Sequence, residues 1–105
     1  MEIVETPVFT RQAESLLSPE ELRALQFFLV CRPAAGAIIQ GSGGLRKLRW
    51  RLQGRGKRGG VRIIYYWVTP AARIYLLLLY SKNVRSDLTP AEVRLLRKLI
   101  DEQEG

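Results

Sequence analysis

The residues of this chain that could do chemistry are its cations, which are concentrated in one stretch. Between Arg46 and Arg62 the sequence holds eight lysines and arginines and no acidic residue. These are Arg46, Lys47, Arg49, Arg51, Arg55, Lys57, Arg58 and Arg62. Guanidinium and ammonium groups form charge-assisted hydrogen bonds with phosphate oxygens. The stretch therefore predicts a surface that binds a polyanion.

Charge is segregated along the whole chain, which has 105 residues and a net charge of +7. All ten acidic residues lie in the first 21 positions or from Asp87 onward, and residues 22–86 contain thirteen lysines and arginines and no acid. An ordinary solvated surface mixes both signs, whereas segregation of this kind is typical of a nucleic-acid surface. A membrane surface is disfavoured, because the charges do not lie on a basic amphipathic helix.

The residue types that are missing exclude most catalytic devices. The chain has no histidine, which excludes His-based triads, dyads and metal sites. Its single cysteine excludes a zinc cluster. The acids lie outside the basic stretch and show no metal-binding pattern, which disfavours a two-metal nuclease. We therefore expect no metal and no cofactor.

One metal-free reaction fits the remaining residues: attack of an RNA 2′-hydroxyl on the adjacent phosphorus, with loss of the 5′-oxygen. Arginine and lysine stabilise the negative charge that develops, but two protons must also move, and an ordinary lysine titrates near ~10. Because neighbouring cations lower the pKa of a lysine, crowding can create a usable base or acid. Our hypothesis is that Lys47, Lys57 or Lys82 takes this role. Full activity in all three Lys-to-Met variants would refute it.

RNA binding without chemistry is the main alternative, and the residue types alone favour it. Basic strands with aromatic residues occur in many RNA-binding proteins. Retained binding with loss of cleavage in the lysine variants would support the catalytic hypothesis instead.

Two strand-like runs must position the cations: Leu45–Leu52 and Val61–Trp67, with the glycine-rich basic loop Gly54–Gly60 between them. Successive side chains of a strand point to opposite faces. Three basic side chains of the first run therefore share one face: Lys47, Arg49 and Arg51. Leu48, Trp50 and Leu52 share the other. Arg62 is a charge at the start of an otherwise apolar second strand.

The rest of the chain predicts an α+β frame. Local patterns indicate a strand, two helices, a further strand and a final helix: Glu2–Thr6, Phe9–Leu17, Ser18–Cys31, Ile74–Tyr80 and Thr89–Glu102. Capping boxes begin the second and third helices at Ser18 and Thr89. We predict one domain over residues 1–105, with a small antiparallel sheet, the order β-α-α-β-β-β-α and the helices packed on one face.

The cysteine content and the apolar runs indicate the compartment. One cysteine cannot form an internal disulfide, so we expect a reduced cytoplasmic setting, with Cys31 a buried small hydrophobe. The acidic N-terminus lacks the hydrophobic stretch of a signal peptide. The longest apolar run, Ile74–Tyr80, is far shorter than the ~20 residues of a membrane span. We therefore expect no membrane partner.

Three stretches together resemble one known family. They are Gly44–Trp50 (GLRKLRW), Gly54–Gly60 (GRGKRGG) and Tyr80–Pro90 (YSKNVRSDLTP). With the predicted element order, they resemble the RelE/HigB toxins of bacterial type II toxin–antitoxin systems, in particular a HigB-like subgroup. The resemblance covers nearly the whole chain.

The resemblance implies a small ribosome-dependent endoribonuclease that inhibits translation. Members of the family cut mRNA in the ribosomal A site without a metal. A cognate antitoxin neutralises them and usually represses the operon, so the partners implied are an antitoxin, the ribosome and mRNA, with DNA reached indirectly through the antitoxin complex. The ParE toxins share the architecture but poison gyrase, and this remains a third alternative.

The resemblance also implies site residues. By position Lys47, Arg49 and Arg62 match the set that orients the scissile phosphate, and Lys82 and Asn83 match later basic catalytic positions. We assign catalysis to Lys57, Arg62 and Lys82. We assign RNA binding to Lys47, Arg49, Arg51, Arg55, Arg58 and Asn83. Several relatives carry a tyrosine or histidine near the start of the final helix where this chain has Asp87, Leu88 and Thr89, which increases the weight on Lys57 and Lys82.

Overall fold

A computed structural model of the chain describes residues 1–52, 60–85 and 87–105. Within them the elements follow the order β1 (Glu2–Glu5), α1 (Pro7–Leu16), α2 (Pro19–Cys31), β2 (Ala37–Ile38), β3 (Arg46–Arg51), β4 (Gly60–Val68), β5 (Arg73–Ser81) and α3 (Pro90–Glu104). The α+β class is confirmed. The one addition to the predicted order is β2, a two-residue strand inside the connector between α2 and β3.

The strands form one five-stranded sheet in the order β1-β5-β4-β3-β2. As predicted, β3, β4 and β5 form an antiparallel meander. However, β1 pairs with β5 in parallel, so the sheet is mixed and not wholly antiparallel. The alternation of side chains in a sequence indicates which residues share a face but not which way a neighbouring strand runs.

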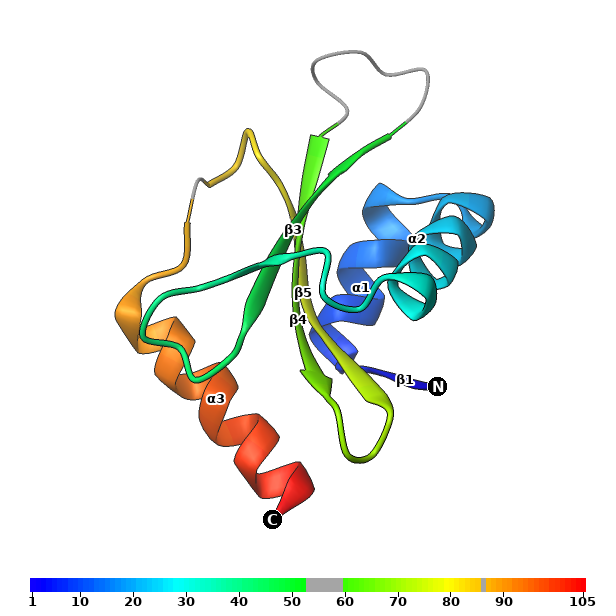
Figure 1. Cartoon of the computed structure of the whole chain (residues 1–105). Coiled ribbons are helices and arrows are strands. Elements are labelled where there is room, and N and C mark those ends of the chain that lie inside the picture. Colours follow the sequence, from blue (N-terminus) through cyan, green and yellow to red (C-terminus); the bar gives the residue numbers. More distant parts are fainter. Residues whose placement is uncertain (53–59, 86) are drawn as a thin grey trace.

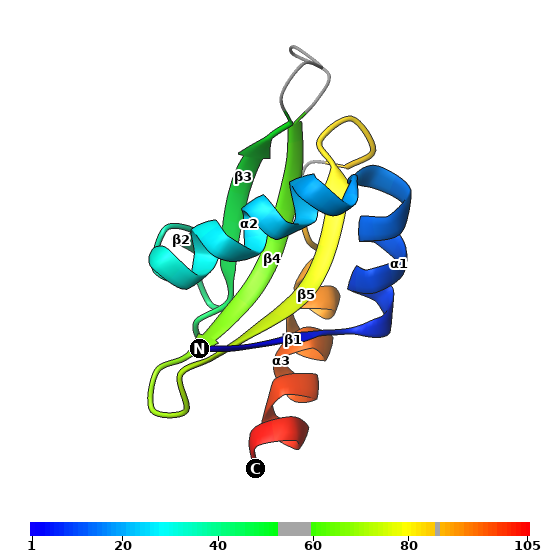
Figure 2. The same cartoon turned by 90° about the vertical axis from the view of Figure 1, so that its right-hand side faces the viewer.

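Helices cover both faces of the sheet, so the prediction that they pack on one face is wrong. Figures 1 and 2 show α1 and α2 on one side of the sheet and α3 on the other. The physical reason lies in the central strands, which are apolar on both faces. Ile63 and Tyr65 of β4 pack on the side of α1 and α2, whereas Ile64 packs on the side of α3. A sheet with two apolar faces needs cover on both.

Two hydrophobic clusters fill these interfaces. The first joins α1 and α2 to the sheet through buried side chains such as Phe9, Leu25, Leu48, Ile63 and Leu76. The second joins α3 to the sheet through Leu45, Ile64, Leu77, Leu96 and Ile100. The strand faces expected from the sequence are confirmed, because Leu48 and Leu52 belong to the first cluster, opposite the basic residues of β3.

Local signals set the helix ends. Both predicted capping boxes are present: Ser18 with Glu21, and Thr89 with Glu92. Cys31, the last residue of α2, is exposed and not buried as predicted. It follows the buried Leu29 by two residues, or roughly 200° around the helix, so it points away from the core. Among the described residues, no helix is both long and apolar enough to cross a membrane.

Candidate nucleic-acid interface

Two arginines stand directly opposite each other on the α3 side of the sheet. Arg49 of β3 pairs in register with Arg62 of β4, which in turn pairs with Tyr80 of β5. Like charges at directly opposed positions destabilise a strand pair. Arg49 and Arg62, which we call the arginine row, therefore destabilise the strand pair in the free protein but are well placed to bind an anion together.

A cavity of about 370 Å³ lies over the arginine row. It is lined by Lys47, Arg49, Arg62, Lys82, Asn83, Arg85 and Asp87, which we call the cationic site. A second cavity of about 380 Å³ adjoins it and is lined by Arg49, Trp50, Arg51, Gly60, Arg62 and Lys82. Because Arg49, Arg62 and Lys82 line both cavities, these three cations lie at the centre of the surface that the two cavities form.

Five residues that the sequence assigned to function come together in the cationic site: Lys47, Arg49, Arg62, Lys82 and Asn83. Arg51 lines the second cavity but not the cationic site. The other three assigned residues, Arg55, Lys57 and Arg58, lie outside the described residues, so their roles stay predictions.

Lys47 is held by an ion pair at one end of the site. Its Nζ lies 2.9 Å from Oδ1 of Asp87, and the lysine side chain is only 22% exposed. The hydrogen bond from Lys47 is the main cause that lowers the pKa of Asp87 below its usual value. Asp87 is therefore ionised at neutral pH.

Arg85 holds the segment between β5 and α3 in place. Its guanidinium donates to both carboxylate oxygens of Glu92 in the first turn of α3, at 2.8 Å for the Nη1–Oε2 contact. It also donates to the backbone carbonyl of Asp87 at 3.1 Å and lies over the ring of Tyr80, 5.4 Å from its centroid. Arg85, foremost, lowers the pKa of Glu92 to about 2. Arg85 therefore has a structural role, because its guanidinium is occupied by contacts within the protein.

Lys82 stands at the opposite end of the site from Lys47. Its backbone N–H donates to the carbonyl of Gly60 at 3.3 Å. A Cβ added at Gly60 would lie 3.1 Å from Cδ and 3.3 Å from Cε of Lys82, so the glycine makes room for this side chain. Within the described part of the chain, Arg49, Arg62 and Lys82 have no carboxylate partner.

The site has a definite order along β4. Lys82 contacts Gly60, the arginine row follows at Arg62, and Lys47 lies opposite Ile64. These positions are two residues apart, so the span from Gly60 to Ile64 is roughly 13 Å at about 3.3 Å per residue. A phosphate on the arginine row would have Lys82 on one side and the Lys47–Asp87 pair on the other.

The hydroxyl of Tyr80 completes the neighbourhood. It is buried and, among the described residues, makes no hydrogen bond. Burial, foremost, raises the pKa of Tyr80 above its usual value, so the phenol stays protonated at neutral pH. Tyr80 is therefore not a ready proton acceptor.

Sequence reasoning did not assign Arg85 and Asp87 to the site, although both lie in the motif Tyr80–Pro90. Their nearness to Lys82 in the chain was the available signal. The sequence alone could not indicate the ion pair between Lys47 and Asp87, because it joins residues 40 positions apart.

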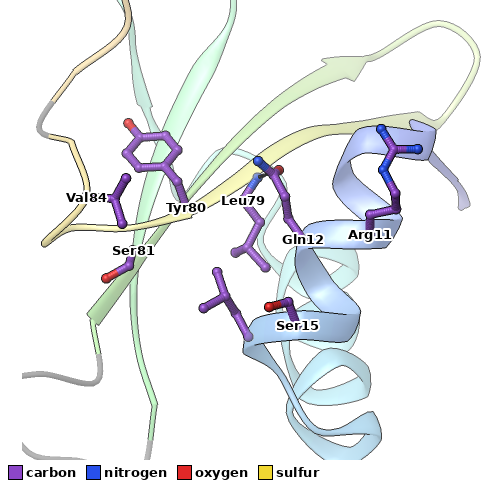
Figure 3. Close-up of a pocket in the computed structure, with 8 residues that line it drawn as sticks. Arg11, Gln12, Ser15, Leu79, Tyr80, Ser81 and Val84 are labelled. Carbon is purple, nitrogen blue, oxygen red and sulfur yellow. Dashed lines mark hydrogen bonds between the residues drawn. The ribbon is translucent and has the colours of Figure 1, made fainter.

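A further cavity lies between α1 and β5, and it shares no lining residue with the cationic site (Figure 3). It has about 330 Å³ and is lined by Arg11, Gln12, Ser15, Leu16, Leu79, Tyr80, Ser81 and Val84. The side chain of Gln12 accepts a hydrogen bond from the backbone N–H of Leu79 at 2.8 Å, which covers part of the sheet edge. With Arg11 as its one cation among the described residues, this cavity does not fit a polyanion.

Comparison with known proteins identifies the fold. The sequence matches no model of a known protein family. A doubly substituted variant of the E. coli toxin RelE, solved in the free state, aligns over 79% of this chain and 84% of its own, with a TM-score of 0.59 and 14% identity. The isolated E. coli RelE toxin aligns over 93% and 97%, with a TM-score of 0.57 and 12% identity. The chain is therefore similar in fold to RelE.

Proposed function

We propose that this protein is the toxin of a toxin–antitoxin pair and a ribosome-dependent endoribonuclease that cleaves mRNA in the A site, inhibiting translation. The cationic site carries the proposal, because it gathers on a RelE-like fold three cations that have no carboxylate partner among the described residues. The motifs that resemble the RelE/HigB toxins support it and favour the HigB-like subgroup.

The arrangement of the cations suits a single phosphate better than a diffuse polyanion. Arg49 and Arg62 are neighbours across β3 and β4, and Lys82 borders both cavities that they line. The two arginines repel each other in the free protein. An anion between them relieves this repulsion and can form charge-assisted hydrogen bonds with both guanidinium groups. We assign Arg49 and Arg62 to the nonbridging oxygens of the scissile phosphate, where they stabilise the charge that develops during attack.

Cleavage proceeds by attack of the 2′-hydroxyl and leaves a 2′,3′-cyclic phosphate and a 5′-hydroxyl. Lys82 is our proton donor for the leaving 5′-oxygen, because it lies at one end of the site without an acidic partner in the described residues. Lys57 keeps its proposed part in proton transfer, and Arg51, Arg55, Arg58 and Asn83 keep theirs in RNA binding.

The proposal includes partners and a compartment. They are a cognate antitoxin, the ribosome and mRNA in the cytoplasm, with DNA reached only through the antitoxin complex. Expression of the protein should arrest growth, and co-expression of the product of an adjacent small gene should restore it.

Mapping of mRNA 5′ ends after a brief induction tests the proposal. We expect new 5′-hydroxyl ends that form only when ribosomes are present, and a loss of about 100-fold in Arg62→Met. Arg23→Met is the matched control, because Arg23 is exposed on α2, on the other side of the sheet from the site, and among the described residues it pairs with Glu20 of its own helix.

The alternatives give different outcomes in the same experiment. Intact mRNA with binding that weakens by roughly 0.7 log units per phosphate contact for each tenfold rise in salt would indicate a non-catalytic RNA-binding module. Intact mRNA with signs of DNA damage would indicate a gyrase-directed toxin.

A further inference from the structure

Asp87 is out of place in a site built only to bind RNA. Of the described residues that line the cationic site, five are cations, one is an amide and Asp87 alone carries a negative charge. Its side chain is 69% exposed and lines the cavity that a phosphate would enter. A carboxylate in that place repels RNA, and a module selected for binding alone would be better without it.

The position of Asp87 is nevertheless secured from two directions. Lys47 of β3 holds its Oδ1 at 2.9 Å, and Arg85 donates to its backbone carbonyl at 3.1 Å. Arg85 itself donates through Nη1 and Nη2 to the carboxylate of Glu92 in the first turn of α3. A carboxylate accepts up to about four hydrogen bonds, so the pair with Lys47 leaves acceptor capacity toward the cavity.

The order of groups along the site matches the geometry of the reaction. In an in-line displacement the attacking 2′-oxygen and the leaving 5′-oxygen stand on opposite sides of the phosphorus. The arginine row lies between Lys82, at Gly60, and the Lys47–Asp87 pair, at Ile64. The attacking 2′-oxygen requires a base at one end of the site, and the leaving 5′-oxygen requires an acid at the other.

The other candidate groups near Asp87 are poor proton acceptors. The Nζ of Lys47 already donates a hydrogen bond to Asp87, and the phenol of Tyr80 is protonated because burial raises its pKa. Asp87 is ionised, since Lys47 lowers its pKa. A carboxylate with a low pKa is a weak base, so its contribution belongs at the lower end of the usual 10²–10⁴-fold range.

We propose that Asp87 is the general base of the RNA cleavage, an assignment that rests on the proposed function. The 2′-O–H bond breaks and its proton passes to the Asp87 carboxylate while the 2′-oxygen bonds to phosphorus. The bond from phosphorus to the 5′-oxygen breaks, and the 5′-oxygen takes a proton from the Lys82 ammonium. Proton exchange with water restores both groups, and no oxidant, reductant or metal is consumed.

The test separates binding from cleavage in Asp87→Asn. Removal of the negative charge should tighten binding of a short fluorescein-labelled RNA severalfold, while the single-turnover rate on mRNA-programmed ribosomes falls about 100-fold. Asp101→Asn is the matched control. Asp101 is 61% exposed, pairs with Arg97 at 2.7 Å and loses the same unit of charge, but it lies outside the cationic site. It should leave the cleavage rate unchanged.

A second variant guards against a merely structural effect. Cleavage by Asp87→Ala should rise in proportion to added formate, compared with chloride at equal ionic strength, because a free carboxylate replaces the missing base. An Asp87→Asn protein that cleaves at the wild-type rate or faster overturns the assignment, as does loss of RNA binding or absence of formate rescue. If wild-type protein leaves mRNA intact, the proposed function fails first and the assignment falls with it.

Discussion

Replacing Arg49 with methionine should make the protein more stable and less able to bind RNA. Arg49 is exposed and lies directly opposite the half-buried Arg62. Opposed like charges cost roughly 0.2–1 kcal/mol relative to a neutral pair. Methionine keeps an apolar side chain to pack along the strand. The expected gain of 0.2–1 kcal/mol corresponds to a rise in Tm of roughly 1–6 °C for a domain of this size.

The loss of binding follows from the same geometry. Each phosphate contact that is removed from a single-stranded complex lowers the slope of log K against log salt by about 0.7. We therefore expect Arg49→Met to bind a short RNA more weakly at low salt and with a shallower salt dependence. Fluorescence anisotropy over a salt series measures both, and urea unfolding at low ionic strength measures the stability.

The neighbouring Arg51 supplies the control for stability. It lies on the same face of β3 but opposite Gly60, so Arg51→Met relieves no cross-strand repulsion. The free energy of unfolding of the Arg51→Met protein should stay within about 0.5 kcal/mol of the wild-type value. Arg49→Met that is less stable than Arg51→Met would refute the reasoning, because the arginine row would then be held by interactions that outweigh its repulsion.

Three further predictions concern the segment around the site and the helix on the other face. Glu92 has a pKa lowered to about 2 from 4.5, mainly by Arg85, so its contribution to stability is present above pH 4.5 and is lost as the pH falls toward 2. Glu92→Gln should flatten the fall in Tm between pH 4.5 and 2.5; an unchanged fall would speak against the pair. Gly60→Ala should slow cleavage severalfold by displacing Lys82, with a Tm equal to or above wild type, since its Cβ would lie 3.1 Å from Cδ of that lysine; an unaltered cleavage rate would show that the lysine position is not critical. Cys31 is exposed, so a thiol reagent should modify the native protein rapidly without loss of cleavage, and a reaction that waits for unfolding would contradict its placement.

The faces of the strands could be predicted from the sequence because alternation in a strand is local. Lys47, Arg49 and Arg51 fall on one face whatever their neighbours do. The register between strands is not local, and the sequence did not indicate that Arg49 would stand opposite Arg62. Nor did it indicate the second helical layer, although the apolar residues on both faces of β5 already required one.

Asp87 illustrates the harder limit. Its residue type and its motif were visible, yet the motif suggested only that an expected tyrosine or histidine was missing. The role of a carboxylate depends on what it contacts, and its partner, Lys47, lies 40 positions away in the sequence. An exposed acid at the start of a helix is common, because it interacts favourably with the helix dipole. Only the ion pair inside a cation-lined cavity distinguishes Asp87 from that ordinary case.

The site exists because the chain turns back along the sheet before it begins α3. Just after β5, Lys82 contacts Gly60 at the start of β4, and Asp87 reaches Lys47 at the level of Ile64. This return carries Lys82, Asn83, Arg85 and Asp87 past the arginine row. The pair between Arg85 and Glu92 ties the end of the return to α3, whose far end is tied to β5 by Arg73 and Glu104. Functional groups on strands and on a segment anchored at both ends keep their spacing, which a reaction at one phosphorus atom requires.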